Sequence, residues 1–181
     1  MPKIIKDVDN IIKNCAMELF MKYGYIKVDM RMISVQSKIA VGTIYHYYKN
    51  KQELYLKVLN ESWEVTLIKL DESILINCTS EEKIYRLITT LYYDIKNRNG
   101  LGKVLFDNSV EELKSNNFFT QIKENLLVKV NNIISCIYIE KDEFKSTSRL
   151  TETLLVSIVV MIELHPNDEA ENIEFLKQLV Q

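Results

Sequence analysis

The scarcity of helix-breaking residues is the strongest constraint on the fold of this 181-residue chain. Its only two prolines are Pro2 and Pro166, and it contains four glycines. Proline in a helix interior removes a hydrogen bond and clashes with the preceding turn, so the long proline-free stretch permits unbroken helices. Apolar residues recur at three- and four-residue spacing, as at Ala16, Leu19 and Tyr23. The sequence therefore predicts an all-α fold.

Start and stop signals divide this pattern into separate helices. Asp29, Asn50 and either Thr79 or Ser80 stand where a helix N-cap is expected. Gly24 is expected to end the first helix. We expect helices over residues 8–23, 30–36, 41–48, 51–77, 80–96, 118–139, 150–164 and 173–180, a short apolar segment at 101–106 and a further helix opening at 107–109.

The charged residues are distributed unevenly along the chain. Residues 1–51 hold nine Lys and Arg against four Asp and Glu, a net charge of +5, whereas the remainder carries −7. A basic head on an acidic body is expected of a protein that binds a polyanion through its head alone. Chance variation of surface charge is the alternative explanation.

The segment Lys38–Leu54, which reads KIAVGTIYHYYKNKQEL, has the most specific pattern in the chain. In a short helix over residues 41–48, Ile44 and Tyr48 share one face, which can turn inward. The other face is left with a glycine and four hydrogen-bonding side chains: Gly42, Thr43, Tyr45, His46 and Tyr47. Such a face can approach a polyanion closely. Lys51 begins the next helix, whose N-terminus suits a phosphate.

This segment closely resembles the signature of the TetR family of bacterial transcriptional regulators, whose usual wording is close to G-T-L-Y-H-Y-F-K-S-K-E-E-L. The match continues upstream in one register through AMELF at 16–20, KYGY at 22–25 and MRMI at 30–33. The resemblance covers roughly the first third of the chain. It implies a three-helix helix-turn-helix DNA-binding domain at residues 1–50 and a helical ligand-binding and dimerisation domain at residues 51–181.

The resemblance also implies which residues meet DNA. The first three residues of the third helix would enter the major groove, its tyrosines would bond phosphates beside an exposed histidine, and an arginine of the second helix would reach a phosphate or the minor groove. The lysine that starts the fourth helix would offer its amide and charge to a phosphate. The expected DNA-binding residues are Arg31, Val41, Gly42, Thr43, Tyr45, His46, Tyr47 and Lys51. The alternatives are an ordinary surface arginine and tyrosines that serve only in packing.

Three positions depart from the family pattern, and the third is Val41, which stands where a polar residue is often found. Lys38 occupies the inter-helix turn where glycine is usual, and Ala40 stands where a serine or threonine usually caps the third helix. A non-glycine residue in a left-handed turn costs about 1–2 kcal/mol, and loss of a cap costs about 1 kcal/mol. The fold tolerates these costs. These departures affect how well the start of the third helix can recognise DNA bases, although Val41 could contact a thymine methyl.

The remainder of the chain offers aromatic and flexible apolar groups on several helices. Those we expect to line a ligand cavity are Trp63, Tyr92, Tyr93, Phe106, Phe118 and Met161. They suit a small apolar or aromatic effector, although each of them could simply fill the core. The resemblance implies that the effector acts by a swing of the fourth helix, residues 51–77.

The segment 150–164 is apolar on most of its circumference. One small body cannot cover all of that surface, so we expect a homodimer built on the last two helices. Leu155 and Val159 are the positions at which a charge is expected to break the dimer.

Other classes of function have less support. An all-α enzyme would need clustered histidines and carboxylates, whereas the only histidines are His46 and His165 and no Glu-x-x-His pair occurs. We expect no enzyme activity, no metal and no cofactor. We expect the three cysteines, Cys15, Cys78 and Cys136, to be buried free thiols in a reducing cytoplasm. No apolar run is long enough to span a bilayer.

The sequence as a whole therefore predicts a cytoplasmic, ligand-responsive transcriptional regulator. We expect a repressor that a small apolar or aromatic molecule releases from a palindromic double-stranded DNA operator. The alternative is an all-α interaction or ligand-binding module whose DNA-binding head has decayed.

Overall fold

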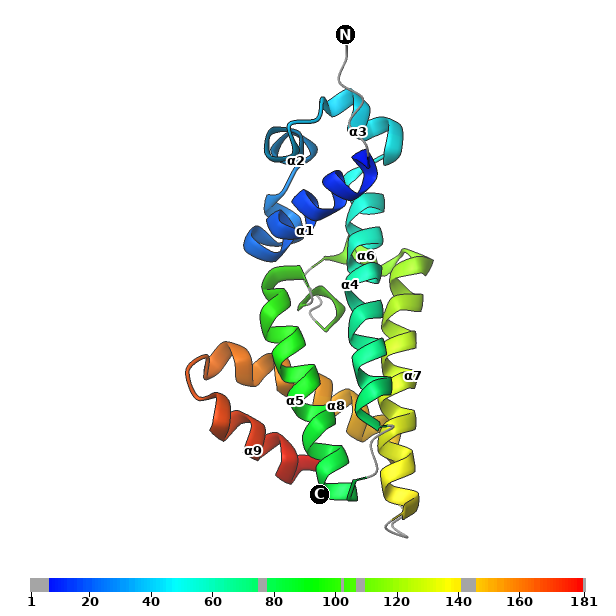
Figure 1. Ribbon diagram of the computed structural model, residues 1–181, viewed down its shortest axis with the longest axis vertical. Helices are drawn as coiled ribbons and strands as arrows, with labels where there is room; N and C mark the ends of the chain where they lie inside the picture. Colours follow the sequence, from blue (N-terminus) through cyan, green and yellow to red (C-terminus); the bar gives the residue numbers. More distant parts are fainter. Residues whose placement is uncertain (1–6, 75–77, 102, 107–109, 141–145, 181) are drawn as a thin grey trace.

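The computed structural model describes residues 7–74, 78–101, 103–106, 110–140 and 146–180, and every element in these ranges is helical (Figure 1). The prediction of an all-α fold is confirmed. The α-helices are α1 Val8–Lys27, α2 Met30–Ser37, α3 Val41–Tyr47, α4 Lys51–Ile74, α5 Ser80–Arg98, α6 Glu111–Lys114, α7 Asn117–Glu140, α8 Thr147–Leu164 and α9 Glu169–Val180. Two 3-10 turns follow α5, η1 Asn99–Leu101 and η2 Lys103–Leu105.

The helix starts follow the capping signals in the sequence. The Asp29 carboxylate accepts hydrogen bonds from the backbone N–H groups of Arg31 at 2.9 Å and Met32 at 2.8 Å. Thr79 and Glu82 form the complete reciprocal capping box at the start of α5. These caps satisfy amide groups that have no partner within their own helix.

The end of the first helix differs from the prediction. Gly24 has φ 74° and ψ 170°, which breaks the helical path, but helical structure resumes and continues to Lys27. Glycine tolerates this left-handed φ because it has no Cβ. The break turns Tyr25 into the interior, where it is 5% exposed. The helix that we expected to open at 107–109 has its start outside the described residues, and α6 begins at Glu111.

Helices α1–α3, which we call the head, form one end of the molecule (Figure 1). Lys38 joins α2 to α3 with φ 57° and ψ 26°, so a lysine does occupy the left-handed turn position. The Ser34 hydroxyl donates to the backbone oxygen of Ile39 at 2.6 Å and closes this turn. Ala40 provides no side-chain cap to α3.

Helix α4 leads from the head into the body, which consists of α5–α9 (Figure 1). It packs against α1, α5 and α7, and α8 packs between α7 and the α5–α9 pair. Fully buried apolar side chains from these helices form the body core, among them Leu70, Ile88, Leu91, Val130 and Leu154.

Aromatic packing fastens the head to the beginning of α4. The Tyr55 ring lies 4.9 Å from that of Phe20 and 4.8 Å from that of Tyr25, both edge to face. The Tyr55 hydroxyl donates to the backbone oxygen of Leu101 at 2.9 Å, and the Tyr25 hydroxyl donates to Glu112 at 3.1 Å. The head therefore rests on η1 and α6 of the body.

The prediction that the three cysteines are buried is wrong. Cys136 is exposed, and Cys15 and Cys78 are partly exposed, so the free thiols are not fully buried. The apolar pattern was right for the helices but did not say which turn of each helix faces solvent.

Among the helices in the described ranges, none is both long and apolar enough to cross a membrane.

The expected dimer positions on α8 also need correction. Leu155 is completely buried in the core of its own protomer, and Val159 is half-buried. The apolar side chains that α8 turns to solvent are Val156 at 48% exposed, Val160 at 36% and Leu164 at 68%. They follow one another at intervals of four residues and so form one stripe along the helix.

Candidate nucleic-acid interface and effector site

Helix α3 buries one face and exposes the other, as the sequence predicts. Ile44 is completely buried and Tyr48 is 6% exposed, whereas Tyr45 and Tyr47 are 50% and 44% exposed. The packing-only alternative for these two exposed tyrosines is thereby excluded. The remaining residues expected at DNA on this helix are also exposed: Val41, Gly42, Thr43 and His46.

Tyr48 fixes the position of α3 relative to α1. Its hydroxyl donates to Oδ1 of Asp9 at 2.6 Å, and Lys13 pairs with both Asp9 at 3.2 Å and Glu61 at 2.8 Å. Burial and the neighbouring Asp9 carboxylate raise the pKa of Tyr48, so the hydroxyl stays protonated and donates. The outward face of α3 is thus held by a hydrogen-bonded anchor at its C-terminal end.

Gly42 is not required by the packing of the protein itself. A Cβ at this position would meet no atom within 4 Å, and its φ is not left-handed. A glycine costs helix stability in an exposed interior position. Neither the packing nor the backbone conformation of the free protein therefore requires a glycine at the start of α3.

The start of α4 is capped as expected, but Lys51 is directed differently. The Glu53 N–H donates to Oδ1 of Asn50 at 2.8 Å, and Glu53 accepts from the Lys49 N–H at 2.8 Å. The Lys51 ammonium donates to the backbone oxygen of Tyr25 at 2.9 Å and lies over the Tyr25 ring. Its charge therefore faces the head and not the solvent, which differs from our expectation for this side chain.

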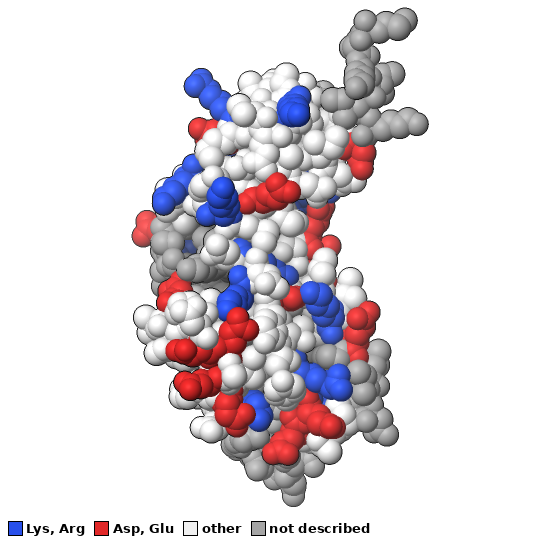
Figure 2. All heavy atoms as spheres, turned by 60° about the vertical axis from the view of Figure 1, so that its left-hand side comes forward, with Lys and Arg blue, Asp and Glu red and all other residues white. Residues whose placement is uncertain are grey.

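The distribution of charge agrees with a polyanion-binding head. On the face in Figure 2, Asp and Glu side chains are most numerous over the body, while the head is largely uncharged and shows several Lys or Arg together with a few acidic side chains. Arg31 is exposed in the first turn of α2, and Lys49 is exposed just beyond α3. In the sequence, Arg31 precedes α3 and Lys49 follows it.

The residues expected to line one effector cavity do not lie together. Trp63 and Tyr92 are buried, Phe106 and Met161 are half-buried, and Tyr93 and Phe118 are exposed. Trp63 contacts Phe106 edge-on, with ring centroids 6.3 Å apart. The Tyr92 and Tyr93 rings form a second pair at 5.6 Å. Asn172 links this second pair to Met161, since it donates to the Tyr92 hydroxyl at 3.0 Å and to the Met161 carbonyl at 3.4 Å.

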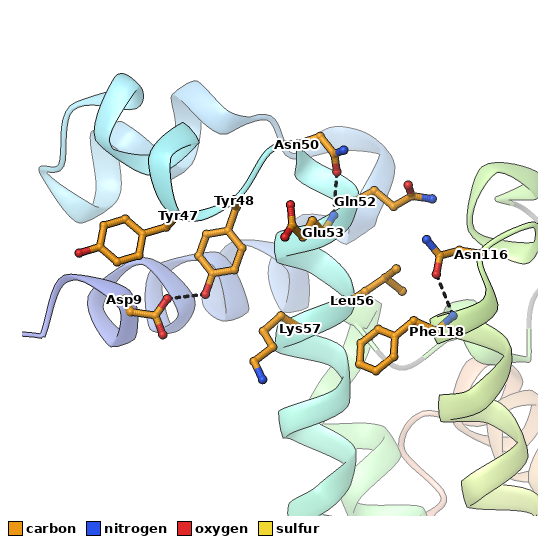
Figure 3. Close-up of a pocket in the computed structure, with 10 residues that line it drawn as sticks. All are labelled: Asp9, Tyr47, Tyr48, Asn50, Gln52, Glu53, Leu56, Lys57, Asn116 and Phe118. Atoms are coloured by element: carbon orange, nitrogen blue, oxygen red, sulfur yellow. Dashed lines mark hydrogen bonds between the residues drawn. The ribbon is translucent and has the colours of Figure 1, made fainter.

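Phe106 and Phe118 line two different hollows. Phe106 lines a pocket of about 230 Å³ in the body with Lys123, Leu127, Glu152, Leu155 and Val156. Phe118 lines a cleft of about 490 Å³ between the head and the body, where Tyr47, Asp9 and Lys57 also point (Figure 3). Charged groups border both hollows, but the body pocket also has the buried core residue Leu155 in its wall.

A buried polar cluster between α4 and α5 was missed by sequence reasoning. Arg98 donates from Nε to the Ser62 hydroxyl and from Nη2 to the Ser62 carbonyl, both at 2.6 Å, and also to the Thr66 hydroxyl. Thr66 in turn donates to Asp94 at 2.7 Å. Lys69 donates to the other oxygen of Asp94 at 2.8 Å.

The Arg98 guanidinium remains charged although it is buried. Burial lowers its pKa to about 10, against the raising effect of Asp94, whose carboxylate oxygen lies 3.8 Å from Nη2. Its Cζ lies 4.3 Å from the centre of the Trp63 ring. Helical spacing could have found this residue, because Arg98 continues the buried stripe of Leu87 and Leu91 on α5.

No group of three or more His, Cys, Asp or Glu among the described residues is arranged to hold a metal ion. The described residues do offer an exposed polar helix face on the head, and a pocket and a buried cation in the body.

Comparisons with known proteins agree with this arrangement. A model of the bacterial regulatory proteins of the tetR family matches residues 12–58. The "Fatty acid metabolism regulator protein" of Bacillus subtilis is 26% identical over 128 residues, 71% of this chain and 61% of that protein. The "HTH-type transcriptional regulator QacR" of Staphylococcus aureus is 32% identical over 98 residues, 48% of each protein. The matches thus span about half to three fifths of these curated relatives.

Solved structures share the fold over nearly the whole chain. The fatty acid degradation regulator FadR of Bacillus halodurans has a TM-score of 0.76 at 16% identity, covering 94% of this chain and 96% of that one. FadR of Bacillus subtilis in complex with stearoyl-CoA has a TM-score of 0.74 at 17% identity, with the same coverage. At these identities the similarity shows the fold alone. Together with the exposed recognition face of α3, the family match leads to one assignment: the helix-turn-helix of residues 12–58 is that of the tetR family of bacterial regulatory proteins, which are DNA-binding transcriptional regulators.

Proposed function

We propose that this chain is a repressor that binds a palindromic operator as a homodimer and that a small, largely apolar molecule releases it. The observation that carries the proposal is the outward face of α3. Two buried residues, Ile44 and Tyr48, fix the helix, while a bare glycine and four hydrogen-bonding side chains remain exposed on it. No packing within the protein requires that combination.

The residues of the head then divide by role. Val41, Gly42 and Thr43 at the start of α3 enter the major groove, where the bare backbone of Gly42 permits close approach. Tyr45 and Tyr47 donate to phosphates, and His46 lies exposed between them. Arg31 reaches a phosphate from α2, and Lys51 contributes the amide at the start of α4.

The dimer interface is the exposed apolar stripe of α8 together with the adjoining helix α9. Val156, Val160 and Leu164 form the stripe, and Phe175 of α9 is 50% exposed. A two-fold partner would cover these side chains and set the two α3 helices roughly 34–36 Å apart, one turn of DNA.

The names of two relatives suggest which effectors to test first. One relative is a fatty acid metabolism regulator, and one similar structure was solved with stearoyl-CoA. We extend this to compounds with an alkyl chain, which suit the pocket lined by Phe106, Leu127 and Leu155. Effector binding must weaken operator binding by the same factor by which operator weakens effector binding.

The experiment is a gel shift with DNA from upstream of the chain's own gene. Binding should be specific and should fall steeply with salt, because Lys and Arg of the head displace counterions. Thr43→Ala and Tyr45→Phe should each weaken it, whereas Tyr85→Phe, which changes an equally exposed tyrosine on α5, should not. Unchanged affinity in both head variants would refute the role of α3. A protein that binds no such DNA would instead support the alternative of a decayed head.

A further inference from the structure

We propose that the effector carries a carboxylate, which Arg98 and Trp63 bind between α4 and α5. This inference rests on the proposed function and specifies the chemistry of its effector. The site combines two buried donors that have no acceptor with a local excess of positive charge and an adjoining apolar pocket.

Two neighbouring donors in this interior lack an acceptor. Arg98 is 6% exposed and Trp63 is 2% exposed, yet among the residues that the structure describes Nη1 of Arg98 and Nε1 of Trp63 find no hydrogen-bond partner. All the other guanidinium nitrogens of Arg98 are bonded to Ser62 or Thr66. Buried donors without acceptors are rare in native proteins because each costs its full desolvation penalty. Two of them on side chains in direct contact indicate one missing acceptor group.

The charge of the cluster selects an anion over a neutral acceptor. Arg98 and the half-exposed Lys69 bring two positive charges, and in the described part of the chain Asp94 is the one carboxylate paired with them. A monoanion would balance the buried guanidinium, whereas an alcohol, ester or thioester oxygen would leave its charge uncompensated. A carboxylate also has two oxygens, one for each free donor.

An apolar pocket lies on the other side of the same aromatic pair. Arg98 lies on the face of Trp63, and Phe106 contacts Trp63 edge-on. Phe106 is in turn a wall of the 230 Å³ pocket that Leu127 and Leu155 also line. A shift of the half-buried Phe106 ring would join the pocket to the two donors. The ligand class is therefore an amphipathic carboxylate, with its chain in the pocket and its head at Arg98.

The site adjoins the contact between body and head. Arg98 is the last residue of α5, and the next three residues form η1, which packs against α1. The backbone of Leu101 in η1 accepts the Tyr55 hydroxyl. A carboxylate that pulls on Arg98 thus acts one turn away from the surface on which the head rests.

The test compares dodecanoate with methyl dodecanoate and dodecanol on the full chain without DNA. Trp63 is the only tryptophan, so the protein has a single indole N–H resonance in a ¹⁵N correlation spectrum. Dodecanoate should shift that resonance and bind about tenfold or more tightly than either neutral compound in calorimetry. Arg98→Gln should reduce dodecanoate affinity to that of the ester. Arg86→Gln, which removes an exposed arginine from the same helix, should change neither result.

Several results would overturn the proposal. They are equal affinity for the acid and the ester, no dodecanoate binding up to its solubility limit, an unmoved indole resonance, or a preference for the acid that survives in Arg98→Gln. If circular dichroism shows that Arg98→Gln is unfolded, Arg98→Lys and the wild-type comparison of acid with ester decide the question. Carboxylate binding with no effect on operator affinity would refute the proposed switch but would leave this site standing.

Discussion

Replacing Gly42 by alanine should stabilise the protein and weaken its binding to DNA. Gly42 lies in α3 with open space around the position of a Cβ, so the added methyl meets no strain in the free protein. Alanine is favoured over glycine in a helix by roughly 0.5–1 kcal/mol. For a chain of this size, that gain corresponds to a rise in Tm of about 1–4 °C.

The same methyl group should be harmful at a close interface. If DNA approaches the backbone at Gly42, the methyl occupies space that the complex needs, and overpacking of this kind costs about 1–3 kcal/mol. Affinity should therefore fall roughly 5- to 150-fold. Thermal melting followed by circular dichroism measures the first effect, and fluorescence anisotropy with a labelled operator measures the second.

Gly24→Ala is the matched control, because Gly24 has φ 74° and lies away from α3. Alanine in that conformation costs about 1–2 kcal/mol, so this variant should melt earlier and bind DNA with unchanged affinity once folded. A Gly42→Ala protein with a raised Tm and unaltered operator affinity would refute the argument that glycine is present for close approach to DNA.

Three further predictions concern the dimer, the turn and the head anchor. Val156→Glu should convert the dimer to monomer in sedimentation without unfolding it, whereas Leu155→Glu should unfold the chain, because only the first side chain is exposed; a Val156→Glu protein that remains dimeric would place the interface elsewhere. Lys38→Gly should raise the free energy of unfolding in urea by about 1 kcal/mol, since it relieves a left-handed lysine; a loss of stability would contradict this. Against the opposing effect of burial, hydrogen bonds from Tyr48 and Lys13 lower the pKa of Asp9, so the ionised form stabilises the fold above its unfolded pKa. The stability difference between wild type and Asp9→Asn should therefore begin to shrink as the pH falls through about 4 and go on shrinking as the pH passes the lower pKa of Asp9 in the folded protein; a difference that does not change with pH over this range would exclude this linkage.

Local sequence signals predicted much of the head because its conformation is decided over a few residues. The cap at Asp29 and the two faces of α3 both depend on spacing within one helix. Such features are determined by backbone geometry and by which side chains can turn inward together.

The body was harder to predict because long-range packing decides which parts of its helices are covered. Leu155 and Val156 are adjacent and both apolar, yet one is fully buried and the other is nearly half exposed. The expected effector residues failed to converge for the same reason: Phe118 faces the cleft toward the head, and Phe106 faces a pocket in the body. Arg98 was overlooked because a charged residue in an apolar stripe is ordinarily assumed to turn outward.

The way in which α4 is attached to the head bears on how such regulators could be recombined. Tyr55 packs between Phe20 and Tyr25, and Lys51 bonds the backbone of Tyr25, so the first turns of α4 belong mechanically to the head. In a chimera joined at residue 50, the head would lose Lys51 and Tyr55, because the first turns of α4 would come from the other protein. A junction placed after Tyr55 would transfer operator recognition together with both of these supports, and the contacts of the head with Glu61, Leu101 and Glu112 would need to be rebuilt.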